Sequence, residues 1–593
     1  MHPALRIDEI LVIIFSDPVL SSRSDGRVLP SNTSALLSDE VSRRHPLLAL
    51  ALTCKTFHEP ATEMLWRRVD SLDRLVRTMP RDLIEVFDPR SQRANRDTDE
   101  SAEGEERLII ELFGKWPTER CIIFKRDPTE QDWRIFERFA AYVHEFGRAD
   151  GSHDKFRLDE NIHQALQARY SPEAPILPQL RKLACNGCKQ LGYANLLLPR
   201  PPQTLFTSLS VHGGCSSCTL AFIADAGNSN SIANLTHIHL GTHYIPQDFY
   251  SSFSDFLMTC ARGKVKSLYI PGVPITLDTM KSVLQWQTLE ELSLRVLTFD
   301  AEVLGGELLR PFLRRFEVEM EPVLVTSDSG GGLENFYSDL VTRLRAPGLV
   351  DLRLRETRLP VAHDMKHFLR MLAQSESFAD EAQAWRTPCI RLIPARHNIP
   401  EPPVPLPDAY ICTFSNSLHV LCQPSLTNPA QTRFSQLCML ELYETAVDVA
   451  DEELGILASA LPRLISLVFS TRSHGGGKSR TTLIGLWLLA KRCMQLETVS
   501  LLVDAALDWT VFDFLTGTIG DHTNDCARLD QLAQGRNDNL HALHLGDSTI
   551  QDEDLVTRFL QAVFPKIKNL CYTNSREMTS DMKRWRAVKH RLG

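Results

Sequence analysis

Residues 289–294 read LEELSL, with apolar side chains at the first, fourth and sixth positions. Eleven further segments repeat this spacing, and their starts fall mostly 24 to 32 residues apart. They are LRKLAC (180–185), FTSLSV (206–211), LTHIHL (235–240), VKSLYI (265–270), LRRFEV (313–318), LVDLRL (349–354), LCMLEL (437–442), LISLVF (464–469), LETVSL (496–501), LHALHL (540–545) and IKNLCY (567–572). One such hexamer is common in any protein, but twelve near-periodic copies indicate a repeat architecture.

The spacing within each hexamer is that of a short β-strand. The fourth and sixth residues lie on one face of a strand and point into a core, while the first packs under the preceding turn. Residues 278–286 have the composition of a helical return leg. The sequence therefore predicts an α/β fold, in which an irregular leucine-rich repeat solenoid of parallel strands and helical return legs covers residues 177–593. The concave face of such a solenoid is expected to bind a target protein.

One part of this region lacks the hexamer pattern. Between Leu354 and Leu437 the chain contains six prolines from Pro394 to Pro407, which favour an extended polyproline conformation. We expect a Pro-rich surface loop over residues 394–408. A Pro-x-x-Pro ligand for another domain is the alternative.

The N-terminal part has helical rather than strand periodicity. Apolar residues 7, 10, 11 and 14 form one stripe of a first helix. Pro46 suits the first turn of a second helix, which is apolar on nearly every side through residue 54. Pro60 suits the start of a third, short helix that carries Met64, Leu65 and Trp66. Because three short helices cannot hide this much apolar surface, a partner surface is implied.

Three stretches of this region resemble the three helices of an F-box, in the form found in fungal F-box proteins with a C-terminal leucine-rich repeat array. They are EILVIIF (9–15), LALALTCKTF (48–57) and LWRRV (65–69), and residues 54–57 and 65–67 are the most specific part. The resemblance implies a substrate-recognition subunit of an SCF-type ubiquitin ligase, bound to a Skp-type adaptor and through it to a cullin. The expected adaptor-binding residues are Ile7, Ile10, Leu11, Ile14, Leu48, Phe57, Leu65 and Trp66.

A second hypothesis comes from a departure from the family pattern. Arg6 and Ile7 stand where the family usually has Leu-Pro. The alternative is a leucine-rich repeat scaffold whose degenerate F-box binds no adaptor and caps the array. Both hypotheses predict an F-box-like helical domain over residues 1–87 with an insertion at 17–45, a disordered linker at 88–106 and a connector at 107–176. In the connector, residues 120–127 suit a strand, and Thr129 suits the N-cap of a helix.

Composition narrows the function and the compartment. The net charge of −9 is mild for 593 residues and disfavours nucleic-acid binding. Asp8 and Glu9 interrupt any signal peptide, and the longest apolar runs fall far short of the roughly 20 residues that span a bilayer. The 14 Cys are scattered, as expected of free thiols in a reducing compartment. We expect the cytoplasm or nucleus and no membrane contact.

Two CxxC pairs are the strongest candidate for a metal site. Cys185, Cys188, Cys215 and Cys218 have a spacing that suits four thiolates around a tetrahedral zinc. However, Cys185 is the sixth residue of LRKLAC and is therefore predicted to pack in the core. We expect packing rather than metal binding at these cysteines, and no cofactor.

A glycine-rich segment is the remaining candidate for chemistry. Residues 473–479 read SHGGGKS between a predicted strand and an apolar helix, which is the context of a phosphate-binding loop. Arg472 occupies the position where that motif requires its first glycine. The segment is therefore predicted to be a plain loop, and the protein is predicted not to be an enzyme. An enzyme that uses the CxxC pairs or this loop is the third hypothesis.

Overall fold

The computed structural model describes residues 47–48, 51–53, 55–87, 120–147, 156–171, 174–186, 194–197, 206–212, 234–241, 250–260, 264–296, 308–309, 312–320, 344–346, 349–356, 362–374, 389–394, 411–415, 417–424, 432, 434–443, 446–469, 479–505, 532–572 and 579–592. The chain divides into two compact units, Met1–Val265 and Lys266–Gly593. The predicted linker at 88–106 and the glycine-rich segment up to residue 478 lie outside the described residues, as does the Pro-rich segment after Pro394.

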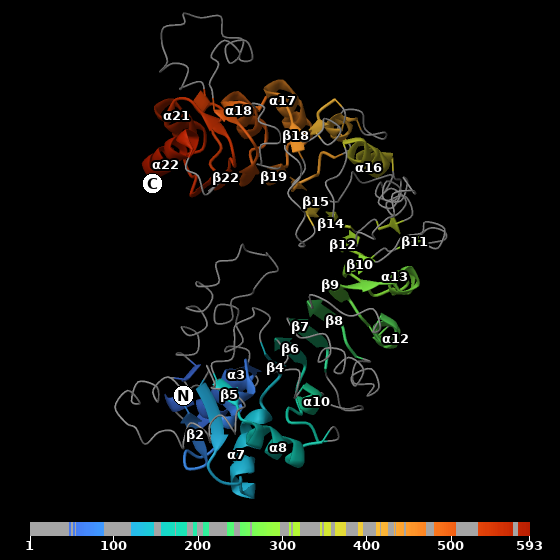
Figure 1. Ribbon diagram of the computed structural model, residues 1–593, viewed down its shortest axis with the longest axis vertical. Coiled ribbons are helices and arrows are strands. Elements are labelled where there is room, and N and C mark those ends of the chain that lie inside the picture. Colours follow the sequence, from blue (N-terminus) through green and yellow to red (C-terminus); the bar gives the residue numbers. More distant parts are fainter. Residues whose placement is uncertain are drawn as a thin grey trace, which may run out of the picture. The chain divides into compact units, whose positions relative to one another are not determined.

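The first unit combines helices with two sheets (Figure 1). Its helices are α3 (Lys55–Trp66), α4 (Leu72–Val76), α7 (Glu130–Ala140), α8 (Glu160–Arg169), α10 (Ala194–Leu197) and α12 (Tyr250–Cys260). Its strands are β1 (Arg68–Val69), β2 (Ile84–Phe87), β3 (Arg120–Phe124), β4 (Glu145–Phe146), β5 (Phe156–Leu158), β6 (Lys182–Asn186), β7 (Ser208–His212) and β8 (His237–Gly241).

Five strands of this unit form a parallel ladder in the order β1-β4-β6-β7-β8. One buried apolar residue of each strand stands opposite its neighbour in register, in the row Val69, Phe146, Leu183, Leu209, Ile238. The strands predicted at 180–185, 206–211 and 235–240 are therefore present. The ladder also includes β1 and β4, which the hexamer pattern missed because Ser71 and Arg148 occupy their sixth positions.

A glycine allows β6 to lie against β4. Gly147, directly after β4, has a φ of 85°. A Cβ at this position would lie 1.7 Å from the carbonyl oxygen of Ala184 in β6. Only glycine fits here, because both the backbone conformation and the close approach exclude a side chain.

The connector contains the predicted strand and helix. β3 pairs with β2 antiparallel and with β5 in parallel. Thr129 caps α7 in a capping box with Asp132, whose side chain accepts the Thr129 N–H at 2.7 Å. Trp133 and Phe136 on the buried face of α7 pack edge to face, with ring centroids 5.9 Å apart.

The helix at Pro60 differs from the prediction. We expected a new helix to begin there, but α3 runs from Lys55 to Trp66 with Pro60 inside it. Proline removes one backbone hydrogen bond and its φ is compatible with a helix. The burial of Pro60 and Ala61 offsets that loss, so the helix continues.

The second unit is the longer part of the solenoid. Its helices are α13 (Leu277–Leu284), α16 (Ala362–Gln374), η6 (Leu418–Cys422, a 3-10 helix), α17 (Asp451–Ala460), α18 (Leu483–Arg492), α21 (Glu553–Val563) and α22 (Ser580–Leu592). Its ladder strands are β9 (Ser267–Ile275), β10 (Glu291–Val296), β12 (Arg315–Met320), β14 (Asp351–Glu356), β15 (Cys389–Pro394), β17 (Met439–Leu442), β19 (Ser466–Phe469), β20 (Thr498–Ser500), β22 (Ala542–His544) and β24 (Asn569–Cys571). Three two-stranded sheets pair β11 (Leu308–Leu309) with β13 (Leu344–Arg345), β16 (Ile411–Thr413) with β18 (Ala446–Asp448), and β21 (Asp504–Ala505) with β23 (Thr549–Ile550).

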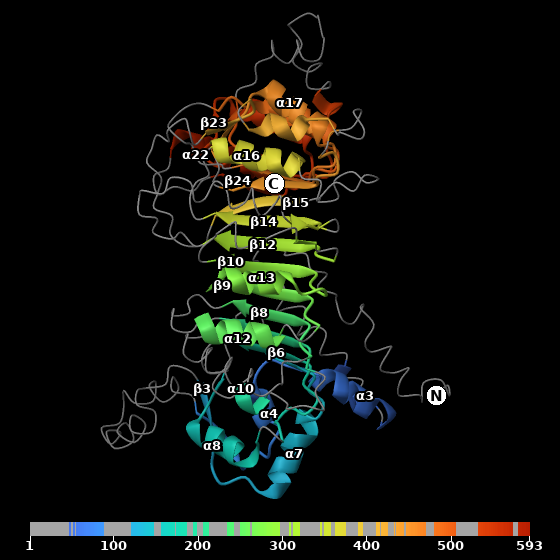
Figure 2. The same cartoon turned by 90° about the vertical axis from the view of Figure 1, so that its right-hand side faces the viewer.

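The ladder of the second unit confirms the predicted parallel solenoid. Figure 2 shows β9, β10, β12, β14 and β15 stacked one on another, and α17, α18 and α21 lie on one side of the strands in Figure 1. The fourth and sixth residues of the hexamers are buried except Tyr572, which is half-buried. Leu292 and Leu294 of β10 and Leu352 and Leu354 of β14 are each about 1% exposed. The predicted return leg at 278–286 is α13.

Between Leu354 and Leu437, where the hexamer pattern is interrupted, the ladder contains one further strand, β15. β15 pairs with β14 on one side and β17 on the other, and Ile390 stands in register between Leu352 and Leu440. The hexamer pattern is incomplete in this repeat because Thr387 occupies the first position, which is normally apolar. Strand pairing on both sides and burial of Ile390 thus compensate for an incomplete hexamer.

In the described residues, no helix is long and apolar enough to cross a bilayer.

Candidate functional site: protein-interaction surfaces

The first candidate surface is the N-terminal helical segment, which we define as the helical residues 47–48 and 51–53 together with α3. Ala51 and Ala61 form its small core, and Leu47, Phe57, Met64 and Leu65 pack partly buried against them. Nδ1 of His58 lies 3.1 Å from the carbonyl oxygen of Ala51, which adds a polar contact within the segment. The core of this segment is therefore small, and the larger apolar side chains around it are only partly buried.

Two leucines of this segment are exposed. Leu48 is 49% exposed and Leu52 is 76% exposed. They are four residues apart, so on a helix they share one face. Sequence analysis selected Leu48 and overlooked Leu52, although an apolar run on every side of a helix was a signal for both. This pair is the clearest apolar surface of the segment.

Trp66, also predicted to contact the adaptor, packs within the chain. Its ring centroid lies 4.8 Å from that of Phe139 in α7. The Tyr142 hydroxyl, just beyond α7, donates to Glu59 of α3 at 3.1 Å. The C-terminal end of the segment is therefore fixed to the α7 region, and part of Trp66 is used there.

The remaining predicted site residues are placed as follows. Phe57 and Leu65 are half-buried in α3. Cys185 is fully buried in β6 opposite Val211, as its position in the hexamer predicted. Ile7, Ile10, Leu11, Ile14, Cys188, Cys215 and Cys218 lie outside the described residues. Among the described residues, no three His, Cys, Asp or Glu side chains are grouped so as to hold a metal ion.

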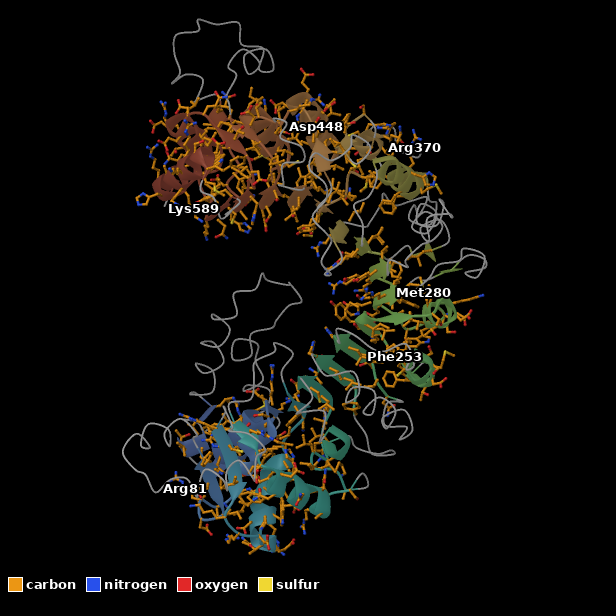
Figure 3. All side chains as sticks on the ribbon, viewed as in Figure 1. Arg81, Phe253, Met280, Arg370, Asp448 and Lys589 are labelled. Atoms are coloured by element: carbon orange, nitrogen blue, oxygen red, sulfur yellow. The ribbon has the colours of Figure 1, made fainter. Side chains whose placement is uncertain are left out.

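The second candidate surface is the open face of the ladder, by which we mean the strand positions that alternate with the buried fourth and sixth residues. In β10, β12, β14, β15 and β17 these positions are rich in charge. In Figure 3, polar side chains extend from these strands on the side opposite α13, the helix that carries the labelled Met280. The charged rows, as we call them, follow the register: Glu291, Arg315 and Asp351 in one, and Glu317, Arg353, Arg391 and Glu441 in the next.

Ion pairs connect the charged rows across the strands. Arg315 contacts Glu291 at 3.4 Å on one side and Asp351 at 3.3 Å on the other. Arg353 contacts Asp351 at 2.7 Å on its own strand and Glu317 at 3.7 Å on the next. Except for Arg353 and Arg391, which stand opposite each other, charges that face each other in these two rows have opposite signs. This pattern favours the observed register over a slipped one.

The two neighbouring arginines, Arg353 and Arg391, are each turned toward a carboxylate. Arg391 contacts Glu441 at 2.7 Å, and Glu441 also accepts a hydrogen bond from Ser466 at 2.9 Å. Like charges opposite each other in register would repel, so carboxylates on both sides are needed to hold the pair.

Burial makes these contacts more consequential than surface ion pairs. The side chains of Asp351 and Arg353 are 12% and 15% exposed. Burial would raise the pKa of Asp351, but the hydrogen bond from Arg353 and the positive charges of Arg353 and Arg391 outweigh it and hold that pKa below its ordinary value. Asp351 is therefore ionised at neutral pH.

Two buried thiols have raised pKa values. Burial, with the charge of Asp351, raises the pKa of Cys389, and burial raises that of Cys493 to about 12. Both thiols are protonated at neutral pH and are poor nucleophiles. The charged rows contain four acidic and three basic side chains, so their net charge is small.

Comparisons with known proteins give a limited result. No family model matches the chain, and no curated protein matches it. Among solved structures, the chain is similar to the complex of Rad7 and Elc1 in yeast, with a TM-score of 0.30, 12% identity, and coverage of 83% of this chain and 94% of that one. It is also similar to an internalin (inlF) from Listeria monocytogenes, with a TM-score of 0.30, 12% identity, and coverage of 68% and 82%. At TM-scores this low, neither likeness carries an inference about partners.

Proposed function

We propose that this protein is the substrate-recognition subunit of an SCF-type ubiquitin ligase. The N-terminal helical segment docks on a Skp-type adaptor and through it on a cullin, and the open face of the ladder holds a target protein. The protein itself performs no chemistry. It raises the effective concentration of the target near the ubiquitin-loaded enzyme, in the cytoplasm or nucleus.

The observation that carries the proposal is the exposed pair Leu48 and Leu52, within the stretch that resembles the second F-box helix. Fully burying a leucine is worth about 1.5–3 kcal/mol, so two adjacent exposed leucines form a strong anchor for a partner. The half-buried Phe57 and Leu65 of α3 are the other described residues that the resemblance assigns to the contact.

Direct binding to a purified Skp-type adaptor tests the proposal. The full chain should bind, and Leu48→Asp with Leu52→Asp should weaken binding by more than about tenfold, because loss of an interface anchor typically costs about 2 kcal/mol or more. Ile456→Asp is the matched control. Ile456 is 50% exposed on α17 in the second unit, so the same kind of change there should leave the adaptor affinity unaltered.

One observation favours the alternative of a scaffold with a degenerate F-box. Trp66 packs on Phe139, so part of the predicted adaptor surface serves to attach the segment to the α7 region. Under that alternative the wild type would show no adaptor binding at about 50 μM. Equal binding by the wild type and the double variant would place the contact elsewhere in the chain.

A further inference from the structure

A row of basic residues follows one edge of the ladder in the first unit, one position before each strand begins. Arg67 precedes β1, His144 precedes β4 and Arg181 precedes β6. The backbone joins these residues directly. The N–H of His144 donates to the carbonyl oxygen of Arg67 at 2.9 Å, and the N–H of Arg181 donates to the carbonyl oxygen of His144 at 2.8 Å. We call these three residues the basic row.

The equivalent positions of the second unit alternate in sign. Lys266, Glu290 and Arg314 precede β9, β10 and β12, and the same backbone hydrogen bonds join them. Nζ of Lys266 contacts Glu290 at 2.9 Å. Like charges on neighbouring strands repel each other, and a carboxylate between two cations offsets that repulsion. The basic row has an imidazole where the second unit has this carboxylate.

The pKa of His144 reflects its position between two arginines. Burial lowers this pKa, and the positive charges of Arg181 and Arg67 lower it further, whereas the charges of Glu63 and Glu145 act in the opposite direction. The lowering effects are the larger ones, so the imidazole is neutral at pH 7. The row therefore lacks the negative charge that its two arginines would favour.

The arginines of the basic row form no ion pair with a carboxylate in the part of the chain that the structure describes. Nη1 of Arg67 contacts the sulfur of Met64 at 3.9 Å. Nε of Arg181 and Nδ1 of His144 are buried without a hydrogen-bond partner among the described residues. Buried donors without a partner reduce stability, so folding alone does not account for this arrangement.

Two further cations lie beside the basic row. Arg68 and Lys182, the first residues of β1 and β6, are exposed, and both stand in register with Glu145 of β4. Lys182 contacts Glu145 at 2.8 Å, and Arg68 has no ion pair among the described residues. With the arginines of the basic row, four cations stand against the carboxylates of Glu63 and Glu145. This local excess of positive charge contrasts with the net charge of −9 of the whole chain.

We propose that the basic row binds an acidic segment of a partner protein, with Asp or Glu side chains of that segment paired to Arg67 and Arg181. Neighbouring strands lie about 4.8 Å apart, so the row distributes its charge over roughly 10 Å. Charge distributed along a line fits several separate carboxylates better than one compact dianion, and the negative net charge of the chain opposes nucleic acid. This site differs from the Leu48 and Leu52 pair, so it goes beyond the proposed function and does not depend on adaptor binding.

The test uses the purified full chain and a fluorescein-labelled hexaglutamate peptide, with binding followed by fluorescence anisotropy at low ionic strength, where screening is weakest. Arg67→Gln with Arg181→Gln should weaken the affinity by at least about tenfold, because an arginine donates charged hydrogen bonds to a carboxylate. Lys583→Gln with Lys589→Gln is the matched control. It removes the same charge from exposed positions of α22 in the second unit and should leave the affinity unchanged.

His144 provides a second measurement, which distinguishes binding at the row from a structural effect of the variants. A carboxylate bound beside His144 favours the imidazolium form, so saturating peptide should raise the pKa of His144. The pH dependence of its modification by diethyl pyrocarbonate measures this pKa, and that of His544 in β22 should not change. Arg67→Lys with Arg181→Lys keeps both charges and should retain most of the affinity.

Four results would overturn the proposal. They are an equal loss of affinity in the α22 control, an unchanged pKa of His144 at saturating peptide, and an equal loss in the lysine and glutamine variants of the basic row. The fourth is binding of a single-stranded oligonucleotide that the glutamine variant abolishes, which would assign the row to nucleic acid. Neutralising the acidic residues of segment 97–106 of this chain should leave peptide affinity unchanged; a gain of about tenfold or more would identify that segment as the occupant instead of a partner.

Discussion

Leucine has opposite environments in the N-terminal helical segment and in the ladder of the second unit. Leu48 and Leu52 are 49% and 76% exposed, whereas Leu292 and Leu294 of β10 are each 1% exposed. The difference in exposure comes from the structural elements that surround each leucine. A ladder strand has a parallel strand on each side and a return leg below, and every neighbour offers the same pair of apolar positions. The helical segment has two alanines at its centre, and Leu48 and Leu52 lie outside the small cluster around them.

Neighbouring strands also allow charged side chains to be buried in the ladder. On the open face, Asp351 contacts Arg315 of one adjacent strand and Arg353 of its own, and its side chain is 12% exposed. A carboxylate in that position is stable only because cations lie on either side of it. The ladder therefore buries both leucines and charges by repetition, while Leu48 and Leu52 of the helical segment stay exposed.

Leu354→Ala should have the largest effect on stability. The residue is 1% exposed in β14, and removal of a buried leucine side chain costs about 2–5 kcal/mol because a cavity remains. Hydrogen exchange followed by mass spectrometry should show the loss of protection in peptides of β12, β14 and β15, since strands of a solenoid depend on their neighbours. Peptides of α3, in the other unit, should be unchanged; a uniform loss across both units would contradict the local character of this packing.

Asp351→Asn should have an intermediate effect that depends on pH. The folded-state pKa of Asp351 is lowered, so its contribution to stability is complete above the unfolded pKa of about 3.9 and is lost as the pH falls through the folded pKa. At pH 7 the variant should be less stable than wild type by about 1–3 kcal/mol, as expected for lost hydrogen bonds to a charged group.

Urea unfolding at pH 7 and at pH 3 measures this change. The difference between the wild type and Asp351→Asn should shrink at the lower pH, where Asp351 of the wild type begins to be protonated. Glu291→Gln is the matched control, because Glu291 contacts the same Arg315 but its side chain is 45% exposed. A difference in stability that grows on acidification would show that the sign of the pKa shift is wrong.

The sequence predicted the ladder well because its signal is repeated and local. All twelve hexamers contain ladder strands, and their fourth and sixth residues are buried except Tyr572, which is half-buried. β15 was missed at Thr387, and β1 and β4 were missed at their polar sixth positions. Pairing on both sides can hold β15 and β4 although their own patterns are incomplete, whereas β1, at the edge of the ladder, pairs with β4 alone. The open face was less predictable. Its contacts, such as Arg353 with Glu317 or His212 with His239, join residues 27 to 36 positions apart and depend on register, which no hexamer contains.

The smallest expected effect on stability is that of Leu52→Ala, the same substitution as Leu354→Ala at an exposed leucine. With 76% of its surface exposed, Leu52 loses little contact on truncation, and alanine is the better helix former. Stability should therefore change by no more than about 0.5 kcal/mol in either direction. Hydrogen exchange in peptides covering residues 51–66 measures this locally. A loss near 2 kcal/mol would mean that Leu52 packs within the chain, so the apolar surface offered to an adaptor would be reduced to Leu48 and the case for docking would weaken accordingly. An unchanged stability combined with reduced adaptor binding would show that this leucine contributes to recognition rather than to folding.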